Sequence, residues 1–337
     1  MKTSCVRYCK LKLALVCLTV VSLSVMAGWG AHDLFHRYYD RSANRKIILK
    51  GFRFTSPLLD VELPEGMKDR YAPIPFKKKI EEYIQAQVKA GTVRNVSVYY
   101  RDLGDGSWFG INETREFNAA SMMKVSVMVA WLKRAEKNPQ LLGQKFVYDG
   151  KINYASMQSI KPLKTIVAGK PYTVDELLHY MLNYSDNNAT YLLFNDLQPD
   201  ELNSVLDGMD ISNHMYDGGN YLTVHGYSGF FRILYNASFL NHEMSEKALQ
   251  LLSLQDFPQG IVAGVPKGTV VAAKFGEYEL GSQNVDGQLH EFGIIYHPKG
   301  AYILGIMTEG RDAARQAEVI RTVSSIIYAE VDAVTSR

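Results

Sequence analysis

The stretch Ala119-Ala120-Ser121-Met122-Met123-Lys124, followed at once by VSVMVAWL over residues 125–132, is the most distinctive part of the chain. Its second half is apolar around the whole helix rather than along one stripe, which predicts a buried helix. Lys124 follows Ser121 by three residues, so the two side chains lie on the same helix face, one turn apart. A lysine near the start of a buried helix is costly unless it is paired or used.

This pair of residues suggests an activated serine. The helix N-terminus favours the negative charge that develops on Ser121, and Lys124, if its pKa is lowered, accepts the hydroxyl proton as attack begins. The same spacing also arises by chance. In that alternative Ser121 only caps the helix and Lys124 extends to solvent.

Two later motifs bear on this choice. Tyr184-Ser185-Asp186-Asn187 follows a predicted helix whose start, Thr173 to Glu176, has the spacing of a capping box. Lys274-Phe275-Gly276 ends the strand-like run VVAAKF, so a cation and a bare backbone lie at a sheet edge. Each motif alone also fits a solvent-facing turn or an ordinary strand end. The order and spacing of the three motifs together carry the prediction.

With these three motifs the chain resembles the class A β-lactamase-like family of penicillin-recognising serine hydrolases, which carry S-x-x-K, S-D-N and K-T-G in this order. The resemblance runs from about residue 76 to the C-terminus. It includes the segments VSVYYRDLGDGSWFGINETREFNAASMMK, YTVDELLHYMLNYSDNNAT, LQPDELNSVLDGMD and GIVAGVPKGTVVAAKFGEY.

The resemblance implies a role for each motif residue. Ser121 would be the acylated nucleophile, Lys124 its base or proton relay, and Ser185 the group that passes a proton to the leaving nitrogen. Substrate would be bound by Asn187, Lys274, Gly276 and Glu277. Asn187 would hold a substrate amide and Lys274 a carboxylate, while the backbone N–H groups of Ser121 and Glu277 would form the oxyanion hole.

The pattern of elements predicts an α+β fold. A helix is expected over residues 76–90, and a hairpin over 95–103 and 108–111 with Gly104-Asp105-Gly106 as its turn. Further strands are expected over 269–275, 288–296 and 301–308, and a last helix over 312–334. The patterns between them are mostly helical. We therefore expect an antiparallel sheet flanked by helices with an inserted all-α subdomain, the β-lactamase/transpeptidase-like architecture.

The N-terminus predicts export. Leu13–Ala31 is 19 residues without a charge, just enough to cross a membrane as a helix, and the preceding stretch is basic. Residues 1–31 are a signal peptide, with Val25-Met26-Ala27 suited to cleavage, or an uncleaved membrane anchor. The following domain is then membrane-anchored facing outside the cytoplasm, or secreted or periplasmic. Residues 32–75 form a proline-containing linker or surface strap, and 76–337 form the catalytic domain.

Composition limits other functions. Cys5, Cys9 and Cys17 all precede the exported part, which therefore needs no disulfide and has no thiolate metal site. The net charge of +2 gives no sign of a nucleic-acid partner. The pairs His242-Glu243 and His290-Glu291 lack the second histidine of a zinc motif, so no metal and no cofactor are predicted.

Three positions depart from the family pattern. The family's E-x-x-L-N loop glutamate, which activates the deacylating water, has no clear counterpart. Glu201 fits the first turn of a helix, and Asp217, a possible substitute, fits a turn. Phe275 replaces a threonine, and we expect its ring to point into the core. Glu277 replaces a serine or threonine, and its carboxylate would repel an anionic substrate.

We therefore predict a serine hydrolase that acylates Ser121 with a β-lactam or a peptidoglycan-type peptide and deacylates slowly. One alternative is a competent β-lactamase with another water activator. The other is a non-catalytic module that binds wall peptides. The predicted partners are the small-molecule substrate and, if residues 13–31 are uncleaved, the membrane.

Overall fold

The computed structural model describes residues 52–56, 74, 76–209, 211–212, 214–216, 219–280 and 285–333. The predicted signal or anchor segment, most of the 32–75 stretch and Asp217 lie outside these residues. Among the described helices, none is both long enough and apolar enough to cross a membrane.

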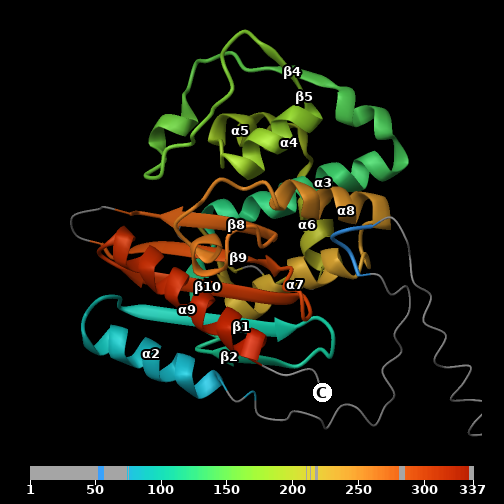
Figure 1. Ribbon diagram of the computed structural model, residues 1–337. Coiled ribbons are helices and arrows are strands. Elements are labelled where there is room, and N and C mark those ends of the chain that lie inside the picture. Colours follow the sequence, from blue (N-terminus) through green and yellow to red (C-terminus); the bar gives the residue numbers. More distant parts are fainter. Residues whose placement is uncertain are drawn as a thin grey trace, which may run out of the picture. The chain divides into compact units, whose positions relative to one another are not determined.

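A five-stranded antiparallel sheet organises the domain, with strand order β2-β1-β10-β9-β8 (Figure 1). Its strands are β1 (Asn95–Asp102), β2 (Trp108–Ile111), β8 (Val271–Tyr278), β9 (Gly287–Ile295) and β10 (Tyr302–Gly310). The N-terminal hairpin pairs with the C-terminal strands through β1 and β10, where Val98 lies opposite Ile306. The predicted sheet, built from both ends of the domain, is confirmed, and β8 is one of its edges.

Side chains alternate between the two faces of this sheet, as the period of a strand requires. Val96, Val98 and Tyr100 of β1 pack in the core beneath helices α2 (Lys77–Lys89) and α9 (Ala313–Ala333). Tyr99 packs in the core on the opposite face. The two predicted terminal helices therefore cover one face together.

The other face is covered by α3 (Lys124–Lys137), α7 (Val224–Tyr235) and α8 (His242–Leu252). Burial extends along α3 from Lys124 to Leu132, which confirms the prediction from its all-round apolar sequence. The indole N–H of Trp131 donates to the carbonyl of Leu193 at 3.0 Å, so its one polar atom is satisfied in the core.

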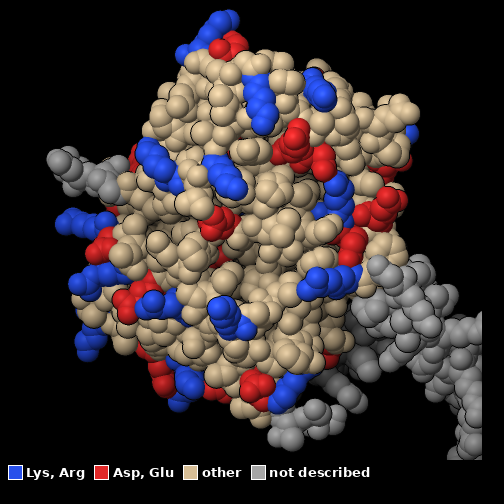
Figure 2. Space-filling view, turned by 45° about the horizontal axis from the view of Figure 1, so that its top comes forward, with Lys and Arg blue, Asp and Glu red and all other residues tan. Residues whose placement is uncertain are grey.

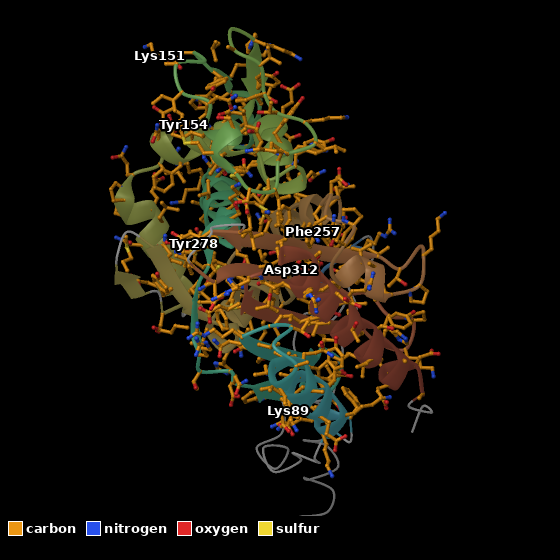
Figure 3. All side chains as sticks on the ribbon, turned by 90° about the vertical axis from the view of Figure 1, so that its left-hand side faces the viewer. Lys89, Lys151, Tyr154, Phe257, Tyr278 and Asp312 are labelled. Atoms are coloured by element: carbon orange, nitrogen blue, oxygen red, sulfur yellow. The ribbon has the colours of Figure 1, made fainter. Side chains whose placement is uncertain are left out.

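The 3₁₀ turns η2 (Ala120–Met123) and η5 (Ile261–Gly264) pack on β8 and α9, and helix α6 (Pro199–Gly208) packs on α3. Helices α4 (Val174–Asn183) and α5 (Asn187–Asp196) and the 3₁₀ turns η3 (Pro139–Gly143) and η4 (Tyr154–Met157) extend beyond the β8 edge of the sheet (Figure 1). Seen from the side, Tyr154 lies among these elements, while Lys89 and Asp312 lie in the sheet-bearing part (Figure 3). The predicted capping box from Thr173 to Glu176 begins α4.

The prediction of an all-α insertion was wrong in detail. Strands β4 (Lys145–Val147) and β5 (Pro171–Thr173) pair within it. A second small sheet joins β3 (Glu116–Asn118), β7 (Gly219–Thr223) and β6 (His214–Tyr216). Most of these strands have three residues, too few for an alternating pattern to be distinguished from a loop.

Residues 52–56, within the predicted linker, pack against the domain. The Glu246 carboxylate accepts the backbone N–H groups of Phe54 and Thr55 at 2.8–2.9 Å. Phe54 is buried, and the hydroxyl of Tyr296 donates to its carbonyl at 2.8 Å. This part of the linker is therefore a strap held on the domain.

The surface carries both signs of charge. On the face in Figure 2, Lys and Arg side chains are interspersed with Asp and Glu, and no large patch of a single sign covers it. This distribution agrees with the net charge of +2.

Candidate active site

A strained turn presents Ser121. Ala120, the residue before it, has φ +45°, in the left-handed region that costs a non-glycine residue about 1 kcal/mol. The Asn118 side-chain oxygen accepts the Ala120 N–H at 3.0 Å, and the Tyr227 hydroxyl donates to the Met122 carbonyl at 2.8 Å. These bonds hold the half-buried Ser121 in place.

Gly276 allows β8 to approach this turn closely. A Cβ atom at Gly276 would lie 2.8 Å from Met122 Cγ and 2.9 Å from the Ala119 carbonyl oxygen. Only glycine leaves room for that approach. The backbone of β8 therefore runs beside the serine turn, as a two-donor oxyanion hole needs; the binding role of Gly276 stays a prediction.

Lys124 is buried, and its ammonium is fully hydrogen-bonded. It donates to the Ser185 carbonyl at 2.6 Å, to Ser185 Oγ at 3.0 Å and to Asn187 Oδ1 at 2.6 Å. Burial lowers the pKa of Lys124 to about 7, against the opposing charges of Asp186 and Glu277. The alternative in which Lys124 extends to solvent is wrong, because its side chain lies inside the site.

The expected contact between Lys124 and Ser121 is not formed. Within the described structure no hydrogen bond joins their side chains, because the ammonium turns toward Ser185 and Asn187. The two residues nonetheless line the same cavity. Catalytic hydrogen bonds often tighten only when substrate binds.

Ser185 connects the two motif lysines. It adopts φ +55°, is fully buried, and its Oγ accepts from Lys124 and from Lys274, each at 3.0 Å. Lys274 also donates to the Phe275 carbonyl at 2.9 Å. Burial, with the charge of nearby Lys124, places the pKa of Lys274 well below its usual range. Two lysines that lose protons easily thus meet on one hydroxyl.

Two polar residues for which the sequence predicts no role hold this turn. The buried Asp186 carboxylate accepts from Thr165 Oγ1, the Ile166 N–H and the Asn188 N–H, each at 2.9 Å. Gln158 donates to the Ser185 carbonyl at 2.9 Å and accepts the Asn187 N–H at 3.1 Å. Asp186 lies inside a recognised motif and could have been included. Gln158 lies in no motif, and only folding brings it here.

The unusual residues of β8 point in different directions. The Phe275 ring is buried and stacks on Phe257 at 4.5 Å, so the prediction that it enters the core is confirmed. Glu277 instead lines the cavity. Its Oε1 accepts the Ser159 N–H at 2.9 Å and the Ile160 N–H at 3.1 Å.

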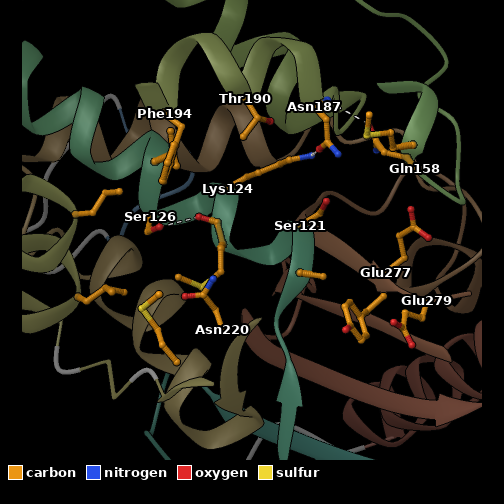
Figure 4. A pocket seen from close by; sticks show the side chains of 18 of the residues that line it. Ser121, Lys124, Ser126, Gln158, Asn187, Thr190, Phe194, Asn220, Glu277 and Glu279 are labelled. Atoms are coloured by element: carbon orange, nitrogen blue, oxygen red, sulfur yellow. Dashed lines mark hydrogen bonds between the residues drawn. The ribbon is translucent and has the colours of Figure 1, made fainter. Parts of the chain in front are cut away.

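These residues surround a cavity of about 750 Å³ (Figure 4). Of the predicted site residues, Ser121, Lys124, Asn187 and Glu277 line it, while Ser185, Lys274 and Gly276 are buried behind its wall. Beyond Asn187, the wall formed by α5 and α6 consists of Thr190, Phe194, Leu202, Asn203 and Leu206.

The Glu201 carboxylate is bonded to Arg134 and does not line the cavity. It lies in the first turn of α6, as predicted, and its carboxylate accepts from Arg134 Nε at 2.6 Å. Arg134 also pairs with Asp196 at 2.7 Å. The hydrogen bond from Arg134 lowers the pKa of Glu201. Glu201 is not among the residues that line the cavity.

Comparison with known proteins identifies the family. The model of the beta-lactamase enzyme family matches residues 75–331 of this chain. The chain belongs to that family. The resemblance inferred from the three motifs is thereby confirmed, and so is a serine β-lactamase-like hydrolase at the level of the family.

Individual relatives are distant. Beta-lactamase SME-1 of Serratia marcescens is 26% identical over 116 residues, which are 34% of this chain and 35% of that protein. The match therefore spans about a third of the length of that curated relative.

Solved structures share the fold. A mutant of PBP-A in an acyl-enzyme complex with penicillin G is 20% identical, with a TM-score of 0.64 over 76% of this chain and 97% of that chain. A β-lactamase from Sphaerobacter thermophilus is also 20% identical, with a TM-score of 0.65 over 77% and 99%. A class A β-lactamase from Mycobacterium abscessus is 21% identical, with a TM-score of 0.64 over 75% and 100%. These likenesses confirm the α+β architecture.

Proposed function

We propose that this protein is a serine hydrolase that forms an acyl-enzyme at Ser121 with a β-lactam or a peptidoglycan-type peptide. The observation that carries the proposal is the convergence of buried Lys124 and Lys274 on the Ser185 hydroxyl beside the cavity that Ser121 lines. Such an arrangement can move a proton from a nucleophile to a leaving group.

The step is an acyl transfer. The Oγ–C bond forms between Ser121 and the substrate carbonyl, and the carbonyl C–N bond breaks. Neutral Lys124 takes the Ser121 proton, Ser185 gives its proton to the leaving nitrogen, and Lys124 returns a proton to Ser185. The backbone N–H groups of Ser121 and Glu277 are proposed to hold the oxyanion.

We propose that the acyl-enzyme is long-lived. The α5–α6 wall offers Thr190, Phe194 and Asn203 but no carboxylate among its described residues, and Glu201 is occupied by Arg134. A water near the ester on that side has no carboxylate base to activate it. The apolar Phe194, Leu202 and Leu206 side chains also disfavour ordered water there.

This activity is proposed to operate outside the cytoplasm. The uncharged Leu13–Ala31 segment behind a basic N-terminus supports export, whether the domain stays anchored or is released.

Intact-mass spectrometry of the full-length chain with penicillin G, followed over time, tests the proposal. We expect an adduct of one penicillin, mapped by peptide analysis to the segment that carries Ser121, and persisting for hours. Rapid loss of the adduct would instead indicate a competent β-lactamase with another water activator. Absence of any adduct at high penicillin concentration would contradict acylation and favour a non-catalytic binding module.

Replacing Glu201 by glutamine should leave the lifetime of the adduct within about twofold of the wild-type value. The carboxylate is bound to Arg134 and is absent from the cavity wall, so it is not placed to activate water. The adduct is followed by mass after removal of free penicillin. A markedly longer lifetime in Glu201→Gln would mean that Glu201 deacylates the enzyme after all.

A further inference from the structure

Glu277 places a carboxylate beside the reacting serine. It follows Gly276 on the edge strand β8, where the strand packs against the Ser121 turn. Figure 4 shows its side chain on the cavity wall next to Ser121, directed toward Gln158. Any acyl donor that reaches Ser121 therefore passes close to this carboxylate.

This carboxylate is held in place by the opposite wall. Its Oε1 accepts the Ser159 and Ile160 N–H groups, while the adjacent Gln158 is bonded to Ser185 and Asn187. The segment 158–160 is thus attached both to β8 and to the turn before α5. Its two hydrogen bonds fix the charge of Glu277 in one position.

The second oxygen of the Glu277 carboxylate is unsatisfied. Oε2 is buried and has no hydrogen-bond partner among the described residues. A buried carboxylate oxygen without a partner is unfavourable and gains most from a cation or a strong donor.

Few Lys or Arg side chains are placed to neutralise the Glu277 carboxylate in the cavity. Among the described lining residues Lys124 is the only Lys or Arg, whereas Glu277 and Glu279 both contribute carboxylates. The Lys124 ammonium already makes three hydrogen bonds inside the protein. Lys274 is fully buried behind the wall and bonded to Ser185 and Phe275. A substrate carboxylate would meet a like charge and no free ammonium.

Position 275 of β8 offers an anionic substrate no hydrogen-bond donor from its side chain. The Phe275 side chain is stacked on Phe257 in the core, so no side-chain donor projects from that position. Both residues of the strand that flank Gly276 therefore act against an anionic substrate, one by lacking a donor and one by its charge.

We propose that Glu277 is a specificity-determining residue that selects acyl donors carrying an ammonium group, and disfavours those carrying a carboxylate, beside the acylated carbonyl. This inference rests on the proposed acylation of Ser121 and names its substrate class. Like charges brought together in a partly desolvated site are strongly disfavoured. We expect a preference of about tenfold or more for the cationic donor.

Three forms of one β-lactam test the proposal on the full-length chain. They are penicillin G, its neutral methyl ester and its cationic diethylaminoethyl ester, which share the reacting ring and acyl side chain. Intact mass distinguishes the three adducts, because each keeps its own carboxylate or ester group. The measured quantity is the second-order rate constant of acylation, and the expected order is cationic, then neutral, then anionic.

Glu277→Gln is the decisive variant. Glutamine keeps an oxygen that can accept the Ser159 and Ile160 N–H groups but removes the charge, so the wall should stay in place. We expect the cationic-to-anionic rate ratio to fall to within about threefold of one. Glu279→Gln is the matched control: Glu279 is an exposed glutamate on the same cavity, so solvent screens it and the ratio should change by about twofold or less.

The outcomes separate the two proposals. If adducts form but penicillin G reacts as fast as its cationic ester, or Glu277→Gln leaves the ratio unchanged, Glu277 does not select charge and this inference fails alone. If Glu279→Gln lowers the cationic-to-anionic rate ratio as much as Glu277→Gln does, the selectivity comes from the overall negative charge of the cavity and the inference also fails. If none of the three compounds forms an adduct, the proposed function fails and this inference falls with it.

Discussion

Replacing Ser121 by alanine will abolish the penicillin adduct completely. Ser121 lines the cavity on a turn held by Asn118 and Tyr227, and its hydroxyl is the atom proposed to form the ester. Alanine removes only that oxygen from a half-buried position, so the turn and the fold should persist. Intact mass after long incubation with penicillin G measures the result.

Ser126→Ala is the matched control for this experiment. Ser126 lies in the first turn of α3, which follows the Ser121 turn, and also lines the cavity, but its hydroxyl donates to the Met123 carbonyl at 2.7 Å. We expect the control to keep the adduct at a rate within about threefold, since one neutral intrahelical hydrogen bond contributes little. An adduct that survives in Ser121→Ala, or that is lost in Ser126→Ala, would place the nucleophile elsewhere.

Replacing Lys124 by methionine is expected to slow acylation by about 10³-fold. Methionine fills a similar apolar volume but cannot accept the Ser121 proton. The Ser185 carbonyl keeps its bond from Gln158 and Ser185 Oγ keeps its bond from Lys274, so the turn retains donors. The acylation rate constant is measured by mass, and thermal unfolding reports whether the variant remains folded.

The pH dependence gives this prediction a second readout. Burial lowers the pKa of Lys124 to about 7, and its neutral amine is the proposed base. The acylation rate should therefore rise with pH, about tenfold per unit well below pH 7, and level off above about 8. The charges of Asp186 and Glu277 oppose this shift, and burial, with the charge of Lys124, also lowers the pKa of the neighbouring Lys274.

Lys133→Met provides the comparison on the same helix. The Lys133 ammonium pairs with Glu136 at 2.9 Å and lies outside the cavity. This variant should keep both the rate and the pH profile. A wild-type rate that is flat between pH 5 and 9, or a Lys124→Met variant with an unchanged profile, would exclude Lys124 as the base.

Much of the fold could be predicted because its signals are local. The β1–β2 hairpin, strands β8 to β10, the terminal helices and the capping box of α4 all lie close to where periodicity and turn residues predicted them. The short strands β4 and β5 were missed. Three-residue strands form because a partner strand distant in sequence supplies hydrogen bonds. The sequence of so short a segment does not predict which strand that partner is.

The site was predicted in part for the same reason. Ser121 and Lys124 are one turn apart in the chain, so their shared location follows from helix geometry. The contact of Lys124 with Ser185 and Asn187 joins residues about sixty positions apart, and no local pattern predicts it. Gln158 carries no motif, and its place beside Ser185 follows from the path of a loop.

The sequence by itself determined the family, the central sheet, the buried serine helix and the absence of a clear loop glutamate. Tertiary structure alone decided that Lys124 and Lys274 both donate to the Ser185 hydroxyl and that Glu201 is bonded to Arg134. It also decided that the backbone of residues 159 and 160 holds the Glu277 carboxylate across the cavity. The physical reason is the distance along the chain over which each interaction acts. Periodicity and capping act over a few residues, whereas burial and charge pairing depend on which distant segments meet.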